Sequence, residues 1–282
     1  MVTFKIKCMS LNCKILQRGN GTQVRDRLIE GVVQRGRHLI ALQDTHVDDR
    51  ATAASIEQRF QCKSGLWTHY CGLLSMSSEL VLERIPVDLG EKGEFDERVL
   101  FARVFSPYGR FDDFYALVVY APPHQSPRKR FYNALLASPL LALRDNSNDT
   151  KYSRLILMGD FNYNDHVGNQ IPRGVPKEWK AMTQSRFLDC VYASVHEVLP
   201  TYRLGRRHST IDYIFAPPQH FSCKRVTKHT DAAEFLPYDI TDHAMIQATL
   251  GVKEYVLARF IHLFKSVIKS LLMALFFPHS PR

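Results

Sequence analysis

Apolar and polar positions along this chain form short runs that predict strands separated by helices. Strands are expected at residues 4–11, 38–42, 72–75, 99–105, 114–120, 154–158, 210–215 and 244–250. Helical spacing predicts a helix over residues 24–37, and Ser126-Pro127 predicts the N-cap and first turn of a helix that runs to about Arg144. Because no repeat or Gly/Ser-rich linker interrupts residues 1–250, we expect them to form one α/β domain.

Polar side chains stand at or beside the ends of these apolar runs. They are Asn12, Asp44, Tyr120, Asp160, Asn162, Asp212, Asp242 and His243. Strand ends are rigid positions that still reach solvent, so several of them can bring polar groups to one crevice. This placement is typical of an active site.

Asp160 and Asn162 directly follow the apolar run of residues 155–158. Alternation in an extended chain predicts that both side chains point to the same side. The carboxylate can then accept a proton from water, while the amide holds that water or a phosphate oxygen. The alternative is an Asx-turn that closes the strand.

Asp212 lies inside an apolar strand, where an unpaired carboxylate is costly to bury. We expect His243 to be its partner. A carboxylate that accepts from one imidazole nitrogen fixes the tautomer and leaves the other nitrogen facing a phosphate. A histidine that is merely satisfied within the core is the alternative.

Asp44 ends another buried run, at residues 39–43. Together with Asn12 and Asp242 it supplies hard oxygen ligands, which Mg²⁺ prefers and which Mn²⁺ also accepts. Clustered thiolates and multiple-histidine motifs are absent from the sequence, so zinc is the weaker expectation.

Six short motifs carry a resemblance to a known family. They are Ser10-Leu11-Asn12, Leu42-Gln43-Asp44, Val119-Tyr120-Ala121-Pro122, Gly159-Asp160-Phe161-Asn162, Ser209-Thr210-Ile211-Asp212-Tyr213-Ile214 and Thr241-Asp242-His243. In this order, over residues 4–250, the chain resembles the endonuclease/exonuclease/phosphatase superfamily, which is DNase I-like. Within this superfamily, the Tyr-Ala-Pro and Ile-Asp-Tyr-Ile motifs are most similar to those of abasic-site endonucleases and of the endonuclease domains of non-LTR retrotransposons. The resemblance implies a four-layer α/β sandwich of two mostly antiparallel sheets flanked by helices, and metal-dependent hydrolysis of phosphoesters.

The resemblance also implies the role of each matching residue. The metal ligands implied are Asn12, Asp44 and Asp242, with Asp242 also close to the histidine. The catalytic residues implied are Tyr120 on the scissile phosphate, Asp160 and Asn162 on the attacking water, Asp212 and His243 on the developing charge, and Asp242 as the acid close to the metal.

Four positions depart from the pattern of this superfamily. Asp44 replaces a glutamate and is one methylene shorter, a deficit of about 1.5 Å against a metal-bond tolerance of about 0.2 Å. Pro123 replaces an asparagine, Thr210 replaces an arginine, and Thr241 replaces a serine but keeps its hydroxyl. A weak or inactive site is therefore an alternative to an active one.

Charge favours an acidic partner, since 37 Lys and Arg stand against 28 Asp and Glu, a formal net charge of +9. Two basic clusters flank the catalytic motifs and are expected to bind nucleic acid: Arg128, Lys129 and Arg130, and Arg203, Arg206 and Arg207. DNA is the expected partner. A solvated basic face is the alternative for either cluster.

Residues 251–282 are expected to form a basic, amphipathic, helical tail. Apolar residues recur at helical spacing over 255–277, but the unbroken apolar run covers only 271–277, far below the roughly 20 residues of a membrane span. The tail is expected to lie on a membrane surface, to pack on the domain or a partner, or to lead to further domains.

The six scattered cysteines predict reduced thiols and no disulfide-linked partner. The N-terminus lacks the apolar core of a signal peptide, so we expect an intracellular protein of the nucleus or cytoplasm. The leading hypothesis is a Mg²⁺-dependent endonuclease that nicks DNA by attack of water. The alternatives are a phosphatase or sphingomyelinase-like phosphodiesterase of the same fold, and a catalytically weak or inactive module that binds nucleic acid or membrane.

Overall fold

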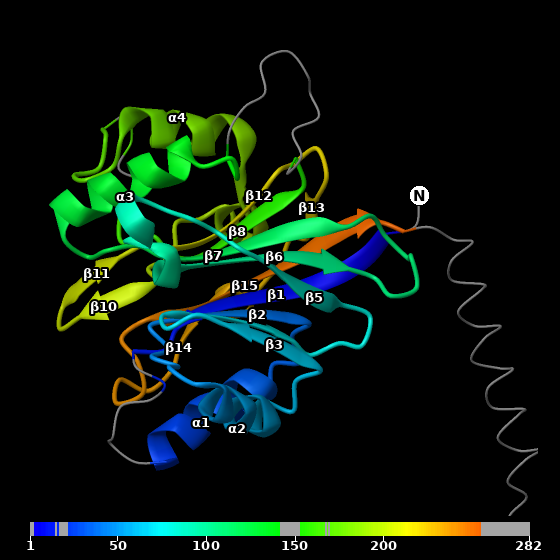
Figure 1. The fold of residues 1–282 in the computed structure, drawn as a ribbon. Coiled ribbons are helices and arrows are strands. Elements are labelled where there is room, and N and C mark those ends of the chain that lie inside the picture. Colours follow the sequence, from blue (N-terminus) through cyan, green and yellow to red (C-terminus); the bar gives the residue numbers. More distant parts are fainter. Residues whose placement is uncertain are drawn as a thin grey trace, which may run out of the picture.

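Two β-sheets pack face to face in a computed structural model that describes residues 3–14, 16, 22–141, 153–166, 168 and 170–254 (Figure 1). The first sheet has the order β13 (Ser222–Cys223), β15 (Ala244–Lys253), β1 (Thr3–Asn12), β2 (Leu39–Gln43), β4 (Cys71–Ser75) and β3 (Ser64–Trp67), with β14 (Ala233–Phe235) also paired to β15. The second has the order β5 (Val81–Ile85), β6 (Val99–Phe105), β7 (Phe114–Tyr120), β8 (Leu155–Asp160), β12 (Asp212–Ala216) and β9 (Leu188–Asp189). Within each sheet one described pair is parallel, β1 with β2 and β7 with β8, and the other described pairs are antiparallel.

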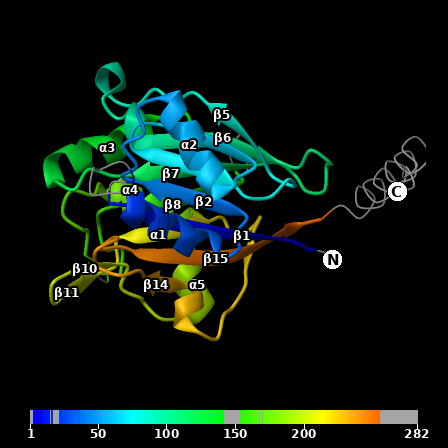
Figure 2. The same cartoon turned by 90° about the horizontal axis from the view of Figure 1, so that it is seen from below.

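Helices cover the outer faces of both sheets (Figure 1, Figure 2). They are α1 (Thr22–Val33) and α2 (Arg50–Phe60) on the first sheet, and α3 (Gln125–Ala137) and α4 (Lys177–Arg186) on the second. The described residues also form α5 (Cys190–Val195), the hairpin β10 (Tyr202–Leu204) and β11 (Arg207–Ser209), and single 3₁₀ turns at Glu91–Gly93, Asp96–Arg98 and His229–Asp231. The expected four-layer sandwich is confirmed.

The strands of the sandwich are buried on both faces. In β7, Ala116 and Val118 belong to the core between the sheets, whereas Leu117 and Val119 belong to the core beneath α3 and α4. A strand covered on both sides is apolar throughout instead of alternating. This is why continuous apolar runs identified the central strands.

Several predicted bounds are confirmed and others are wrong. The strands at 99–105 and 114–120 have the predicted bounds. Helix α1 ends at Val33 instead of residue 37, ahead of Gly36, which has a left-handed φ of 55°. Helix α3 begins after His124 instead of Ser126, and it ends at Ala137 instead of residue 144 because Ser138 is extended.

The predicted tail lies mostly outside the described residues. Strand β15 continues to Lys253, past the expected boundary at residue 250, and residues 255–282 are not described. Over the described ranges, no helix has the length and apolar character needed to cross a bilayer. All six cysteines fall within the described ranges and are free thiols.

Both sheets bring strand ends to one edge of the sandwich. The carboxyl ends of parallel neighbours lie at the same edge, so Asn12 is paired with Gln43 across β1 and β2. In the second sheet, Tyr120, Asp160 and Asp212 occupy paired positions across β7, β8 and β12. The pairing of the strands therefore brings these predicted polar residues together at one edge of each sheet.

Gly159 allows β8 to approach β7 at this edge. Its φ is +148°, and a Cβ at this position would overlap the carbonyl oxygen of Val119. Only glycine leaves room for the strand that carries Asp160.

We expect Gly159→Ala to lower the free energy of unfolding by about 3 kcal/mol or more, because the overlap is with backbone and cannot be relieved by a rotamer change. Gly205→Ala is the control, since Gly205 has φ +58° but open space around it and should lose only about 1 kcal/mol. Urea denaturation of both variants measures the difference. Equal losses would contradict the packing argument.

Candidate active site

Two neighbouring carboxylates, Asp160 and Asp212, are buried at the edge of the second sheet. Each is 2% exposed, and the two residues are paired in register across β8 and β12. They share a strand face with Met158 and Ile214, whose side chains lie in the core between the sheets. Both acids therefore point at the first sheet, and groups from that sheet must compensate their charge.

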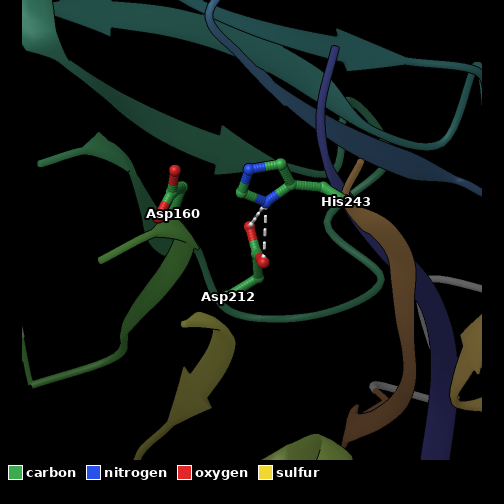
Figure 3. Close-up of side chains that lie close together, drawn as sticks. All are labelled: Asp160, Asp212 and His243. Atoms are coloured by element: carbon green, nitrogen blue, oxygen red, sulfur yellow. Dashed lines mark hydrogen bonds and ion pairs between the residues drawn. The ribbon is translucent and has the colours of Figure 1, made fainter. Parts of the chain in front are cut away.

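His243 supplies the first of these groups. Its Nδ1 donates to Asp212 at 3.0 Å from Oδ2 and 3.1 Å from Oδ1 (Figure 3). His243 directly precedes β15, so this hydrogen bond crosses from the first sheet to the second. Burial lowers the pKa of His243, but the charge and hydrogen bond of Asp212 outweigh it and raise the pKa to about 9. The expected partnership between the acid and the histidine is present.

Asn12 supplies the second group, also across the sheets. Its Nδ2 donates to Asp160 Oδ2 at 2.9 Å, and Asn162 adds its backbone N–H to Oδ1 at 2.8 Å and its amide to Oδ2 at 3.1 Å. Burial and the charge of Asp212 raise the pKa of Asp160 to about 7, although His243 and these hydrogen bonds lower it. Such a carboxylate can gain or lose a proton near neutral pH, as a general base must.

Asn162 reaches Asp160 through a turn instead of an extended chain. Its φ is 54°, and the bond from its N–H to Asp160 closes an Asx-turn. The backbone is therefore not extended here, although alternation predicted that it would be, and it forms the Asx-turn that was the alternative. The two side chains still meet, and Asn162 Nδ2 also donates to the carbonyl of Ala121 at 2.8 Å.

Asp44 and Tyr120 stand beside the acids. Burial, then the charges of Asp44 and Asp160, raise the pKa of Tyr120. Its hydroxyl therefore stays protonated and can donate to a phosphate oxygen. Asp44 has a left-handed φ of 55°, and its Oδ1 lies 2.9 Å from Nε2 of His46.

Lys14 joins Asn12 and Asp242 at the mouth of the site. Its ammonium lies 3.1 Å from Asp242 Oδ2, and its backbone N–H donates to Asn12 Oδ1 at 3.0 Å. The side chain is 46% exposed, so it is open to an incoming anion. No sequence pattern indicated Lys14, which follows β1 in an irregular turn.

A cation fits the donor chemistry of this edge. Asn12, Asp44 and Asp242 carry the oxygens expected from the sequence. Among the described residues, the acids and histidine whose ligand atoms all lie within 4.8 Å of one another are instead Asp160, Asp212 and His243. Gln43, which pairs with Asn12, has a buried Nε2 without a hydrogen-bond partner. A buried donor left unpaired is costly, and an oxygen of bound water or phosphate would satisfy it.

Arg128 is a structural residue in the fold and not an exposed contact for DNA, so this part of the predicted basic cluster is corrected. It is 7% exposed, and its guanidinium donates to the carbonyls of Pro123, Asn162 and Arg173 at 2.9, 2.6 and 2.6 Å. By holding the carbonyl of Asn162, Arg128 fixes the turn that follows Asp160.

Arg203 is also engaged within the chain. Its guanidinium lies 4.6 Å from the ring of Phe235 and 5.2 Å from that of Tyr238, and it donates to the carbonyl of Leu236. The remaining four predicted basic residues are exposed: Lys129, Arg130, Arg206 and Arg207. Of these, Arg130 forms an ion pair with Glu94 at 2.7 Å.

Arg98 is a further cation beside the site that the sequence did not indicate. Its guanidinium lies 4.6 Å from the ring of Tyr70 and 5.0 Å from that of Tyr120, and it donates to the Tyr120 carbonyl at 3.3 Å. Arg98 ends a 3₁₀ turn before β6, where no periodic pattern marks it.

Solved structures share this fold. An endonuclease/exonuclease/phosphatase from Beutenbergia cavernae superposes with a TM-score of 0.64 at 15% identity, over 88% of this chain and 72% of that one. ANGEL2, a 2′,3′-cyclic phosphatase, gives 0.60 at 14%, over 89% and 96%. The human Nocturnin catalytic domain gives 0.58 at 14%, over 89% and 94%. No protein-family model and no curated protein matches the sequence. The expected endonuclease/exonuclease/phosphatase fold is confirmed.

We expect Asp160 to make the folded state less stable as pH rises. Its pKa is about 7 when folded and 3.8 when unfolded, so the stabilisation present at low pH is lost as pH rises through 7. From pH 5 to 8, without metal, the wild type should lose about 2 to 3 kcal/mol relative to Asp160→Asn. Urea denaturation at both pH values measures this, and parallel pH profiles would contradict it.

Proposed function

We propose that the protein is a metal-dependent phosphodiesterase that nicks DNA by in-line attack of water. The observation that supports this most is the buried pair Asp160 and Asp212, compensated from the opposite sheet by Asn12 and His243. It combines a carboxylate that titrates near neutral pH with an imidazole that stays protonated, the two states that acid–base hydrolysis requires.

Asp160 accepts the proton of the attacking water in this proposal. Asn162 and Asn12 already donate to both of its oxygens, so the carboxylate is held in one orientation. The turn that carries Asn162 is tied to α3 by Arg128. Such support limits the reorganisation needed when the water reacts.

His243 and Tyr120 donate to the phosphate oxygens on which negative charge develops. Asp212 occupies Nδ1 of His243, which leaves Nε2 for the substrate. Lys14, beside Asp242, and Arg98, beside Tyr120, add positive charge next to these donors. Asn12, Asp44 and Asp242 would hold the metal, which when bound polarises a phosphoryl oxygen as a Lewis acid.

The hairpin β10–β11 supports a nucleic acid as the substrate. Tyr202 forms a β-bridge with His243, and the backbone N–H of Arg203 donates to the carbonyl of Asp242 at 3.0 Å. The hairpin therefore rises directly from the site, with Arg206 and Arg207 exposed at its turn. Two cations there can follow a phosphate backbone that enters the site.

We expect the purified chain to nick supercoiled plasmid with Mg²⁺ or Mn²⁺, and we expect Asp160→Asn and His243→Gln to lower the rate by about 10²-fold or more. The rate should rise through pH 7 as Asp160 loses its proton and fall above pH 9 as His243 does. Abasic plasmid, 2′,3′-cyclic nucleotides, inositol phosphates and sphingomyelin, assayed in parallel, define the substrate class. Nicking that survives both substitutions, or turnover of only a non-nucleic-acid substrate, would contradict the proposal.

We expect the double variant Arg206→Ala/Arg207→Ala to bind DNA with a shallower salt dependence, by about 2 in the slope of log K against log[salt]. Lys5→Ala/Lys7→Ala is the matched control. It also removes two exposed cations, but from the first half of β1, away from the hairpin β10–β11. Binding measured by fluorescence anisotropy from 50 to 200 mM salt gives both slopes, and equal slopes would exclude the hairpin as a DNA contact.

A further inference from the structure

His46 stands next to Asp44 at the spacing of two metal ligands. Nε2 of His46 lies 2.9 Å from Oδ1 of Asp44. Adjacent ligands on an octahedral cation with bonds of about 2.1 Å are about 3.0 Å apart. In the structure this contact is a hydrogen bond, and a cation held by the pair would take the place of the proton that Nε2 and Oδ1 share.

The backbone holds this pair in an unusual conformation. Asp44 and His46 both have left-handed φ values, 55° and 54°, which cost non-glycine residues about 1 to 2 kcal/mol each. Thr45 between them is tied down through its N–H to the Tyr70 carbonyl at 3.3 Å and its hydroxyl to the His69 carbonyl at 3.0 Å. The imidazole is thus presented to Asp44 by a fixed turn.

Aromatic contacts fix the plane of the His46 ring. Its centroid is 4.9 Å from His69 and 5.3 Å from Tyr70, both edge-on. His69 is itself paired with Asp48 through Nδ1. His46 therefore has little freedom to turn away from Asp44, which is typical of a preorganised ligand.

A buried donor next to Asp44 fits a water or phosphate oxygen that a cation on this side of the site would carry. Gln43, adjacent to Asp44 and fully buried, has an Nε2 without a partner, while its Oε1 accepts from Ser10 at 3.2 Å. At the alternative position, Asp160 already accepts three hydrogen bonds and both oxygens of Asp212 face His243. A cation between those acids would break the bonds that join the sheets.

We infer that His46 ligates the metal together with Asp44, and that the site prefers a first-row transition-metal ion such as Mn²⁺ to Mg²⁺. Imidazole nitrogen suits transition metals, whereas Mg²⁺ selects oxygen. A histidine ligand also offsets the short reach of Asp44. The inference rests on the proposed function only for the presence of a metal.

Mn²⁺ binding to the full chain without substrate tests this inference. Pulsed EPR should detect ¹⁴N coupling from a bound imidazole in the wild type and in His243→Gln, and none in His46→Asn. Calorimetry should show that His46→Asn weakens Mn²⁺ binding tenfold or more and Mg²⁺ binding less than threefold. Asp44→Asn should weaken the binding of both ions.

His166→Asn is the matched control. Nε2 of His166 lies 3.0 Å from Asp189, and its side chain is 22% exposed against 27% for His46, so it removes an equivalent pair elsewhere. It should keep both the coupling and the affinity. If the asparagine variant does not fold, His46→Gln replaces it, since its amide oxygen can also bind a metal. It should also lose the nitrogen coupling.

Two results would overturn the inference. Coupling that persists in His46→Asn and vanishes in His243→Gln places the metal among Asp160, Asp212 and His243. Equal weakening of Mn²⁺ and Mg²⁺ binding, with no nitrogen coupling in the wild type, means that His46 only orients Asp44. Nitrogen coupling in a protein that hydrolyses no substrate would refute the proposed function but support the metal assignment. Nicking by a protein that shows no nitrogen coupling would support the proposed function but refute the metal assignment.

Discussion

The burial of two adjacent carboxylates between two sheets is the constraint on which this structure depends. Asp160 and Asp212 are neighbours in register within one sheet, and their shared face is apolar everywhere else along β8 and β12. Two carboxyl groups in such a gap are stable only if the facing sheet brings hydrogen-bond partners to them. Asn12 and His243 do so, and therefore two polar contacts between the sheets also build the site.

This arrangement raises the pKa values of both Asp160 and His243, so that the two groups titrate in different pH ranges. Burial and mutual repulsion favour a neutral Asp160, while Asp212 keeps His243 charged. Environments that separate titratable groups in this way assign the acid and the base. The same environment is costly for folding, and the apolar core that extends away from this edge, with Val118, Ile156 and Ile214 fully buried, offsets that cost.

Arginines near the site serve two different purposes. Arg128 and Arg203 lie close to chain reversals, where carbonyls without strand partners are available, and their guanidinium groups bind those carbonyls. Arg206 and Arg207 occupy the tip of a hairpin and remain exposed. A cluster of basic residues in the sequence can therefore contain both buried structural residues and exposed ones. Charge alone does not show which of them are exposed.

The sequence by itself determined the long central strands β1, β2, β4, β6, β7, β8, β12 and β15, the position of polar residues at their ends and the need of Asp212 for a partner. Burial on both faces imposes apolar runs on such strands and leaves acids only where they can be compensated. The shorter strands at the sheet edges, such as β3, β5, β13 and β14, have no such run and were not predicted. Only the tertiary structure decided that Asn12 meets Asp160, 148 positions away, that Asn162 turns back on its neighbour, and that Arg128 is buried. It also decided the places of Lys14, His46 and Arg98. These contacts depend on how the sheets pack together and on how irregular turns bind distant carbonyls. The local pattern of apolar and polar residues depends on neither, so it could not predict them.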